Sequence, residues 1–177
     1  MLKTTLSDLE KILGTTFKNP DLLAEALTHK SNLNEDAKIK ESNERLEFLG
    51  DSVLSLLTST ELYKNFPSYP EGKLTNLRSI LVRTQTLGKV SQKLRLGEFL
   101  LMSKGEEHSG GRTNLSLLAD TFEAVIGAMY LDSGLESVKK FLEKNLFSQI
   151  ETLLTDKSTF DYKSRLQEVT QNTERLA

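Results

Sequence analysis

One stretch of twelve residues, 43–54, constrains the fold of this chain more than any other. Read as an α-helix, in which each residue turns about 100°, it places Glu44, Glu47 and Asp51 on one stripe, at positions i, i+3 and i+7. The opposite side carries the apolar residues that we expect to face the core: Leu46, Leu49, Val53, Leu56 and Leu57. The stretch therefore predicts an amphipathic helix with an acidic face.

An acidic helix face is usually a solvated surface, but two features of this stripe favour a different use. Phe48 and Leu54 flank the acids, and no Lys or Arg follows any of them at i+4. Like charges at this spacing destabilise a helix, and beside apolar groups they would cost more. A hard divalent cation such as Mg²⁺, which takes oxygen ligands, would neutralise them.

A second acid-bearing helix is predicted at residues 117–130. Asp120 and Glu123 are again three residues apart, and the small residues Ala124 and Gly127 share their stripe. Small residues allow another helix to approach closely. The core face of this helix should be formed by Phe122, Val125, Ile126 and Met129.

Close packing of the two helices would assemble an oxygen-rich cluster from four carboxylates: Glu47, Asp51, Asp120 and Glu123. Such a cluster suits Mg²⁺ or Mn²⁺ rather than zinc, which favours His and Cys. Bound metal ions activate water and clamp phosphate oxygens, as hydrolysis of a phosphodiester requires. We expect Asp51 and Glu123 to matter most in the chemical step, and we expect no organic cofactor.

The rest of the chain favours helices, and no segment shows the alternation of a strand. Helices are expected at about residues 2–13, 20–28, 74–82, 87–94 and 135–154, with Gly14 and Gly134 as helix ends. Residues 32–42 and 105–113 read as loops. The sequence thus predicts an all-α helical bundle over residues 1–156.

These segments resemble the ribonuclease III family. Residues 43–54 are similar to its signature motif, and residues 117–130, with the preceding SGGR at 109–112, are similar to its second acidic motif. Shorter similarities stand in the same order along the chain: ALTHKS at 26–31, EGKLT at 71–75 and LGEFL at 96–100. The resemblance implies the family's endonuclease domain, an all-α homodimer.

The resemblance also implies an activity. It suggests an endoribonuclease that hydrolyses double-stranded RNA with Mg²⁺, or with Mn²⁺ in its place, at the four carboxylates given above. The expected products have 5′-phosphate and 3′-hydroxyl ends with short 3′ overhangs. Ribosomal and other structured RNA precursors are the expected substrates. The alternative is a double-stranded-RNA-binding protein of the same fold that does not cleave, although such relatives usually lose the carboxylates.

Four further residues have two interpretations each. The resemblance places Glu44 and Glu71 at the mouth of the site, but Glu44 could act only by hydrogen bonding and Glu71 could be a first-turn acid stabilised by its helix dipole. It places Phe48 against the partner subunit, whereas core packing within one chain is the alternative. Arg112, in a glycine-rich loop, could contact RNA phosphates or lie in a solvated loop.

Residues 157–177 are expected to form a linker and an incomplete first helix of a double-stranded-RNA-binding domain, which residues 160–171 resemble. Without that family context, the same residues read as a short, frayed amphipathic helix. If the domain is incomplete, RNA binding should be weak and should fall steeply with salt.

Composition sets the remaining limits. The formal net charge of −2 is unusual for a nucleic-acid-binding protein, although the acids of the proposed site account for part of it. The absence of cysteine, of a signal-peptide pattern and of a long apolar run favours the cytoplasm and no membrane association. Neither histidine follows a glutamate by three residues, which argues against a helical di-metal oxidase.

Overall fold

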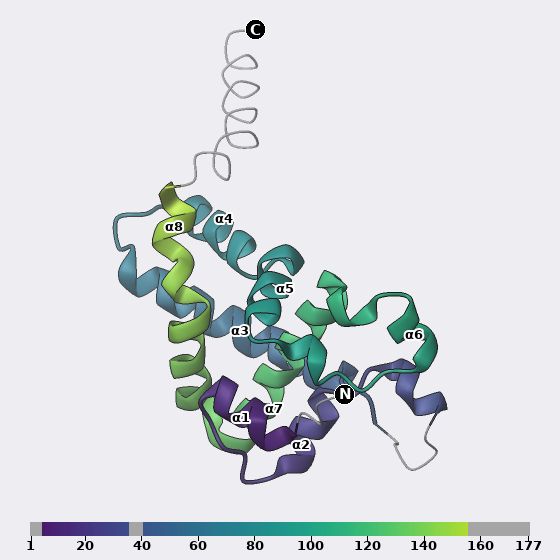
Figure 1. Cartoon of the computed structure of the whole chain (residues 1–177). Coiled ribbons are helices and arrows are strands. Elements are labelled where there is room, and N and C mark those ends of the chain that lie inside the picture. The colour runs from purple at the N-terminus through teal and green to yellow at the C-terminus, as the bar shows by residue number, and fades with distance from the viewer. Residues whose placement is uncertain (1–4, 36–40, 156–177) are drawn as a thin grey trace, which may run out of the picture.

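The structure, a computed structural model, describes residues 5–35 and 41–155, and these residues form an all-α bundle (Figure 1). The expected tail at residues 157–177 lies outside the described residues. The elements, with η for 3₁₀-helix, are α1 Leu6–Leu13, α2 Pro20–Ala26, η1 Lys30–Asn34, α3 Glu44–Asn65, α4 Glu71–Leu81, α5 Thr84–Lys93, η2 Leu96–Glu98, α6 Lys104–His108, η3 Gly111–Thr113, α7 Leu115–Asn145, η4 Phe147–Gln149 and α8 Ile150–Thr155.

The bundle is organised around α7, which contacts α2, α3 and α5. The side chain of Asn114 caps this helix by accepting hydrogen bonds from the backbone N–H groups of Ser116 and Leu117. The predicted core face of α7 is confirmed, since all its members are buried: Phe122, Val125, Ile126 and Met129. Because other helices cover α7 on several sides, acids on it are held against apolar surroundings.

The close approach predicted for the second acidic helix is confirmed where α3 crosses α7. A Cβ atom added to Gly50 would lie 1.8 Å from the carbonyl oxygen of Glu123, and one added to Gly127 would lie 2.2 Å from that of Leu46. Each glycine therefore faces the backbone of the other helix with no space for a side chain. The pair fixes how α3 and α7 cross.

The predicted helix end at Gly134 is confirmed in the backbone, because this residue has φ 76° and ψ 179° inside α7. The expected helix at 135–154 differs in its second half. The continuous helix stops at Asn145, and the chain goes on through η4 and α8. The expected loop at 105–113 also contains regular structure, namely the short helices α6 and η3.

Two expectations about the apolar side of α3 need correction. Leu56, predicted to face the core, is 55% exposed, whereas Leu54 is fully buried. Phe48 is 79% exposed, which excludes core packing within one chain as its role. The other predicted core positions hold, with Leu46 and Val53 buried and Leu49 and Leu57 half-buried. Helix α3 is thus covered by α7 and α4 and leaves a separate apolar stripe uncovered in this chain.

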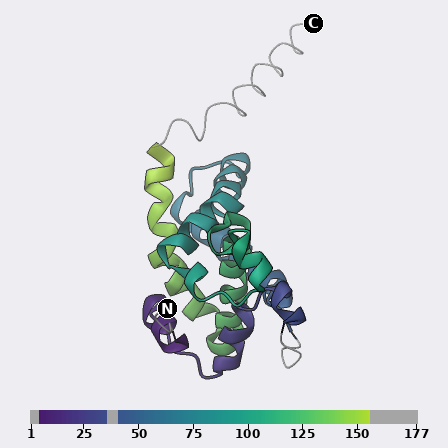
Figure 2. The same cartoon turned by 45° about the vertical axis from the view of Figure 1, so that its right-hand side comes forward.

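The N-terminal helices α1 and α2 lie at one end of the molecule and α4 lies at the other (Figure 1), and the turned view shows the same separation (Figure 2). Between the segments around α2 and α6, the isolated bridge from Thr28 to Leu101 joins two parts of the chain that are distant in sequence. Among the described residues we find no helix with the length and apolar character that crossing a membrane requires.

Candidate metal centre

Three carboxylates meet where α3 and α7 cross. Glu47 comes from the first turn of α3, and Asp120 and Glu123 come from the second and third turns of α7. One oxygen atom from each residue lies within 4.8 Å of the others, and all three side chains are half-buried. We call these three residues the acid cluster. Its position follows from the glycine contact, because Gly50 lies one turn beyond Glu47 and faces the backbone of Glu123.

The acid cluster is electrostatically unfavourable in the absence of a cation. Burial, together with the smaller effects of the negative charges of Asp51, Glu47 and Asp120, raises the pKa of Glu123 to about 8. Burial also raises the pKa of Glu47, and the neighbouring carboxylates add to that effect. The pKa of Asp120 is raised by burial as well. Carboxylates that repel one another in a half-buried position are a suitable environment for a divalent cation.

Asp51 lies beside the acid cluster but is not one of its three members. Its side chain is exposed, one helical turn beyond Glu47. Its negative charge nevertheless raises the pKa of both Glu123 and Glu47, which places it within electrostatic range of each. Its role as a metal ligand stays a prediction.

Glu44, on the first turn of α3, is tied to its surroundings by two polar contacts. Lys30 Nζ lies 3.3 Å from Glu44 Oε1, and Ser42 Oγ donates to Glu44 Oε2 at 3.2 Å. Its charge raises the pKa of Glu47, so it stands at the edge of the acid cluster. Its role at the mouth of the site stays a prediction.

Arg112 has partners inside its own chain. Its Nε donates to Glu107 Oε1 at 2.7 Å, and its Nη1 donates to the carbonyl oxygens of Gly97 and Leu100, each at 2.9 Å. These bonds connect η3 to α6 and to the segment around η2. The structure thus gives Arg112 a role in holding the loop together, and its contact with RNA phosphate stays a prediction.

Glu71 does not lie near the acid cluster of its own chain. It begins α4, accepts a hydrogen bond from Thr75 Oγ1 at 2.7 Å, and lines a pocket together with Leu62 and Tyr63. Leu62 stands fifteen residues beyond Glu47 on α3. At the helical rise, that separation is roughly 22 Å. Within one chain, Glu71 is therefore too distant to take part at the cluster.

One residue near the acid cluster was missed by sequence reasoning. The positive charge of Lys30 opposes the raised pKa of Glu47 and, after the larger effect of His29, that of Asp120. Its ammonium group pairs with Glu44. Helical spacing indicates neutralising partners only within the same helix, for example at i+4. Lys30 comes from η1, fourteen residues before Glu44, and only its neighbourhood in the motif at 26–31 pointed to this region.

The oxygen ligands and the half-buried position of the acid cluster fit a small, hard cation. Carboxylate oxygens are the ligands that Mg²⁺ and Mn²⁺ prefer, and an octahedral ion of this size keeps several water molecules when a protein supplies few ligands. Three protein carboxylates would leave positions for water or substrate. Cysteine is absent from the sequence, so a thiolate site is excluded.

Comparison with known proteins gives a consistent result. The profile of a family described as Ribonuclease-III-like matches residues 19–150. Ribonuclease 3 of Geobacillus kaustophilus (strain HTA426) is 47% identical over 174 residues, which cover 96% of this chain and 69% of that protein. Ribonuclease 3 of Clostridium acetobutylicum is 45% identical over 167 residues, covering 94% of this chain and 72% of that protein.

Solved structures agree with these sequence matches. A crystal structure of the nuclease domain of ribonuclease III from Campylobacter jejuni has a TM-score of 0.74 and 40% identity, covering 88% of this chain and 99% of that one. A second structure of the same domain, described for its flexibility in a region involved in dimer formation, has a TM-score of 0.72 and 42% identity, covering 80% of this chain and 98% of that one.

Proposed function

The chain belongs to the ribonuclease III family and is an endoribonuclease for double-stranded RNA, and we propose that it cleaves by divalent-metal-dependent hydrolysis. The products would carry 5′-phosphate and 3′-hydroxyl ends with short 3′ overhangs. Ribosomal and other structured RNA precursors are the substrates we propose. Mg²⁺ is the proposed metal, with Mn²⁺ able to replace it.

The observation that carries this proposal is the acid cluster. Three carboxylates from two helices have oxygen atoms within 4.8 Å of one another. Burial raises the pKa of each, and repulsion from neighbouring carboxylates raises the pKa of Glu47 and Glu123 further. Such an arrangement costs stability unless a cation compensates it. Its composition supports Mg²⁺ or Mn²⁺ as that cation.

The residues have distinct proposed roles. Glu47, Asp120 and Glu123 would hold the metal, and Asp51, on the exposed side, would complete the ligand set. When bound, the metal would lower the pKa of a water molecule and stabilise the negative charge on the phosphate. Glu123 must give up its proton for the site to load, because a carboxyl group with a pKa of about 8 is mostly protonated at pH 7. Asp51 and Glu123 are therefore the residues we propose as most important for the chemical step.

We also propose that the chain works as a homodimer. The exposed apolar residues of α3 lie on one stripe: Phe48, Leu56 and Tyr63, with exposed fractions of 79%, 55% and 75%. Leu56 stands near the middle of this stripe, with Phe48 eight residues before it and Tyr63 seven residues after it. A two-fold axis beside Leu56 would align two α3 helices antiparallel and place Phe48 of one copy near Tyr63 of the other.

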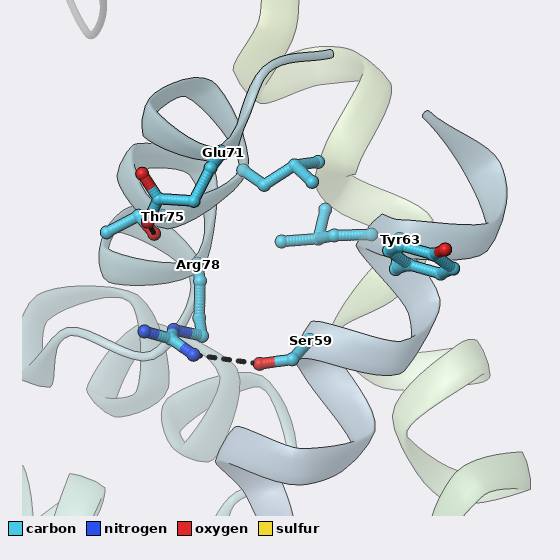
Figure 3. Close-up of a pocket in the computed structure, with 7 residues that line it drawn as sticks. Ser59, Tyr63, Glu71, Thr75 and Arg78 are labelled. Carbon is cyan, nitrogen blue, oxygen red and sulfur yellow. Dashed lines mark hydrogen bonds between the residues drawn. The ribbon is translucent and has the colours of Figure 1, made fainter. Parts of the chain in front are cut away.

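A pocket beside Tyr63 suits the side chain of Phe48. It has a volume of about 170 Å³, and Figure 3 shows Tyr63 of α3 on one side and Glu71, Thr75 and Arg78 of α4 on the other. A hydrogen bond from Arg78 Nη1 to Ser59 Oγ, 2.9 Å long, joins the two helices. A cavity of roughly 150 Å³ is large enough for a benzene ring.

This pairing would also explain the expected position of Glu71. Since Phe48 follows Glu47 directly, inserting Phe48 into the pocket of a second copy brings Glu71 of that copy towards Glu44 and Glu47. The residue that is distant from its own acid cluster would then stand at the mouth of the other one. The proposed dimer would thus give Glu71 the position at the mouth of the site that it does not have within a single chain.

Cleavage of a long RNA duplex at low salt, with and without Mg²⁺, tests the proposal. We expect metal-dependent cleavage by the wild-type chain, 5′-phosphate ends on the products, and loss of cleavage in Glu123→Gln. The matched control is Glu25→Gln, a half-buried glutamate outside the cluster whose pKa is also raised by burial. An intact duplex with the wild-type chain in Mg²⁺ and Mn²⁺, together with RNA binding, would favour the non-cleaving alternative.

A further inference from the structure

We propose that the ammonium group of Lys30 binds a backbone phosphate of the RNA at the edge of the acid cluster, and that in the free chain it is held on Glu44. The inference rests on the proposed function, since it concerns how the same site receives its substrate. It makes Lys30 a substrate-binding residue in addition to the metal-binding carboxylates.

The backbone on both sides of Lys30 is fixed by bonds to distant parts of the chain. His29 N–H donates to the carbonyl oxygen of Leu101 at 2.9 Å, and Asn43 N–H donates to that of Thr28 at 2.8 Å. On the other side, Ser31 Oγ accepts from Ser103 N–H at 3.0 Å. The Cα atom of Lys30 is therefore held in place beside the first turn of α3, and only its side chain has freedom to move.

The ring of His29 strengthens this arrangement. Its Nδ1 accepts a hydrogen bond from Ser31 N–H at 3.3 Å and lies 2.8 Å from Ser31 Oγ. The imidazole thus caps η1 from the N-cap position, directly before Lys30. The residues flanking Lys30 are engaged in holding the segment, whereas the Lys30 side chain extends to Glu44.

The ion pair between Lys30 and Glu44 is weak enough for an RNA phosphate to replace Glu44 as the partner of Lys30. The two side chains are 64% and 56% exposed, and the N–O distance is 3.3 Å. Exposed pairs of this kind contribute about 0–1 kcal/mol. A phosphate carries acceptor oxygens and a full negative charge, so it can take over an ammonium group from an exposed carboxylate at little cost.

The charges around the site also favour a cation at this place when no metal ion is bound. A duplex that approaches the acid cluster brings phosphates towards carboxylates, which repel them. The charge of Lys30 opposes the raised pKa of Glu47 and also that of Asp120, where the charge of His29 has the larger effect. The ring of His29 is engaged with Ser31, whereas, among the described residues, the ammonium group of Lys30 is held only in the exposed pair with Glu44. The net charge of the whole chain is −2, so the chain as a whole does not attract RNA. Each cation that contacts the RNA should therefore contribute a larger share of the binding free energy.

Binding of a labelled RNA duplex in EDTA at low salt, followed by fluorescence anisotropy, tests the inference without cleavage. We expect Lys30→Met to raise Kd roughly five- to tenfold, the effect of one lost charge-assisted contact, and to reduce the slope of log Kd against log salt by about one. Lys30→Arg should stay within about twofold of wild type. Neither variant should change the melting temperature, since the side chain is exposed.

Two further variants separate substrate binding from a merely local ion pair. Lys11→Met removes another exposed lysine with an equally long pair, 3.3 Å to Asp8 Oδ1, and should leave Kd unchanged. Glu44→Gln frees Lys30 and removes a negative charge, so it should tighten binding, opposite in sign to Lys30→Met.

The possible outcomes are distinct. Unchanged affinity and salt slope in Lys30→Met, or equal weakening in Lys30→Met and Glu44→Gln, would overturn the inference. If wild type itself bound no RNA, the proposed function would fail and the inference with it.

Discussion

At the residue scale, Glu123 combines a half-buried position with three negative neighbours. Its pKa of about 8 lies well above the ordinary value of 4.5, with burial as the main cause. A carboxyl group in this state keeps its proton near neutral pH until a cation arrives. Metal binding and proton release are therefore coupled at this residue.

This coupling predicts how the stability of the metal-free protein depends on pH. Between pH 4.5 and about 8, the folded chain keeps the Glu123 proton that the unfolded chain has lost, so the free energy of unfolding should fall as pH rises through this range. Thermal melting in EDTA from pH 5 to 8.5 measures this decrease in stability. Glu123→Gln should flatten the dependence and be more stable than wild type at pH 8. An equally steep decline in the variant would contradict the assignment.

Individual residues also show what sequence reasoning can reach. Glu47, Asp120 and Glu123 could be predicted as a group because helical spacing puts them on stripes and the small residues beside them indicated close packing. The bonds of Arg112 to Gly97 and Leu100 could not, because carbonyl acceptors leave no pattern in side-chain types. The pairing of Lys30 with Glu44 depends on a loop geometry that periodicity does not describe.

At the element scale, the crossing of α3 and α7 determines whether the acid cluster forms. The crossing depends on Gly50 and Gly127, each of which faces backbone rather than a movable side chain. The small residues of the second acidic helix correctly predicted a close approach at Gly127, but Gly50 was not among the predicted contact residues. It could not predict which apolar residues of α3 stay exposed, because that depends on which other helices cover it, and so Leu56 and Leu54 were assigned the wrong way round.

The glycine contact gives a direct prediction. Gly50→Ala places a methyl group 1.8 Å from a backbone oxygen, so the helices must separate, and we expect a loss of stability of about 1–3 kcal/mol or more. The matched control is Gly72→Ala in α4, where an added Cβ meets no atom within 4 Å; helix propensity predicts a gain of up to about 1 kcal/mol there. Urea unfolding of both variants checks this. Equal free energies of unfolding for Gly50→Ala and Gly72→Ala would contradict the close contact between Gly50 and the backbone of α7.

At the scale of the whole molecule, the uncovered stripe on α3 is the basis of the proposed dimer. Leu56→Lys should bring two like charges together at the two-fold axis and shift the chain to monomer in sedimentation equilibrium. Leu131→Lys is the control, since Leu131 is 54% exposed, like Leu56 at 55%, but lies on α7. Phe48→Ala should also weaken the dimer. Dissociation by Leu131→Lys, with Leu56→Lys still dimeric, would place the interface elsewhere.

The whole-molecule charge leads to a prediction about RNA affinity. With a net charge of −2, the chain holds a duplex through a few local cations, so we expect weak binding that falls steeply with salt. A titration of Kd against salt concentration, in EDTA, measures the slope. Tight binding that is insensitive to salt would indicate a contact surface other than the phosphate contacts proposed above.

The central claim is that the acid cluster binds the metal ion on which cleavage depends. Titration with Mn²⁺, followed by electron paramagnetic resonance of the free ion at pH 7.5, tests it without RNA. We predict binding to wild type and to Glu25→Gln, binding weakened by at least about tenfold in Glu123→Gln, and weaker binding to wild type at pH 5.5, where Glu123 is protonated. Equal Mn²⁺ affinity of Glu123→Gln and wild type would contradict the account.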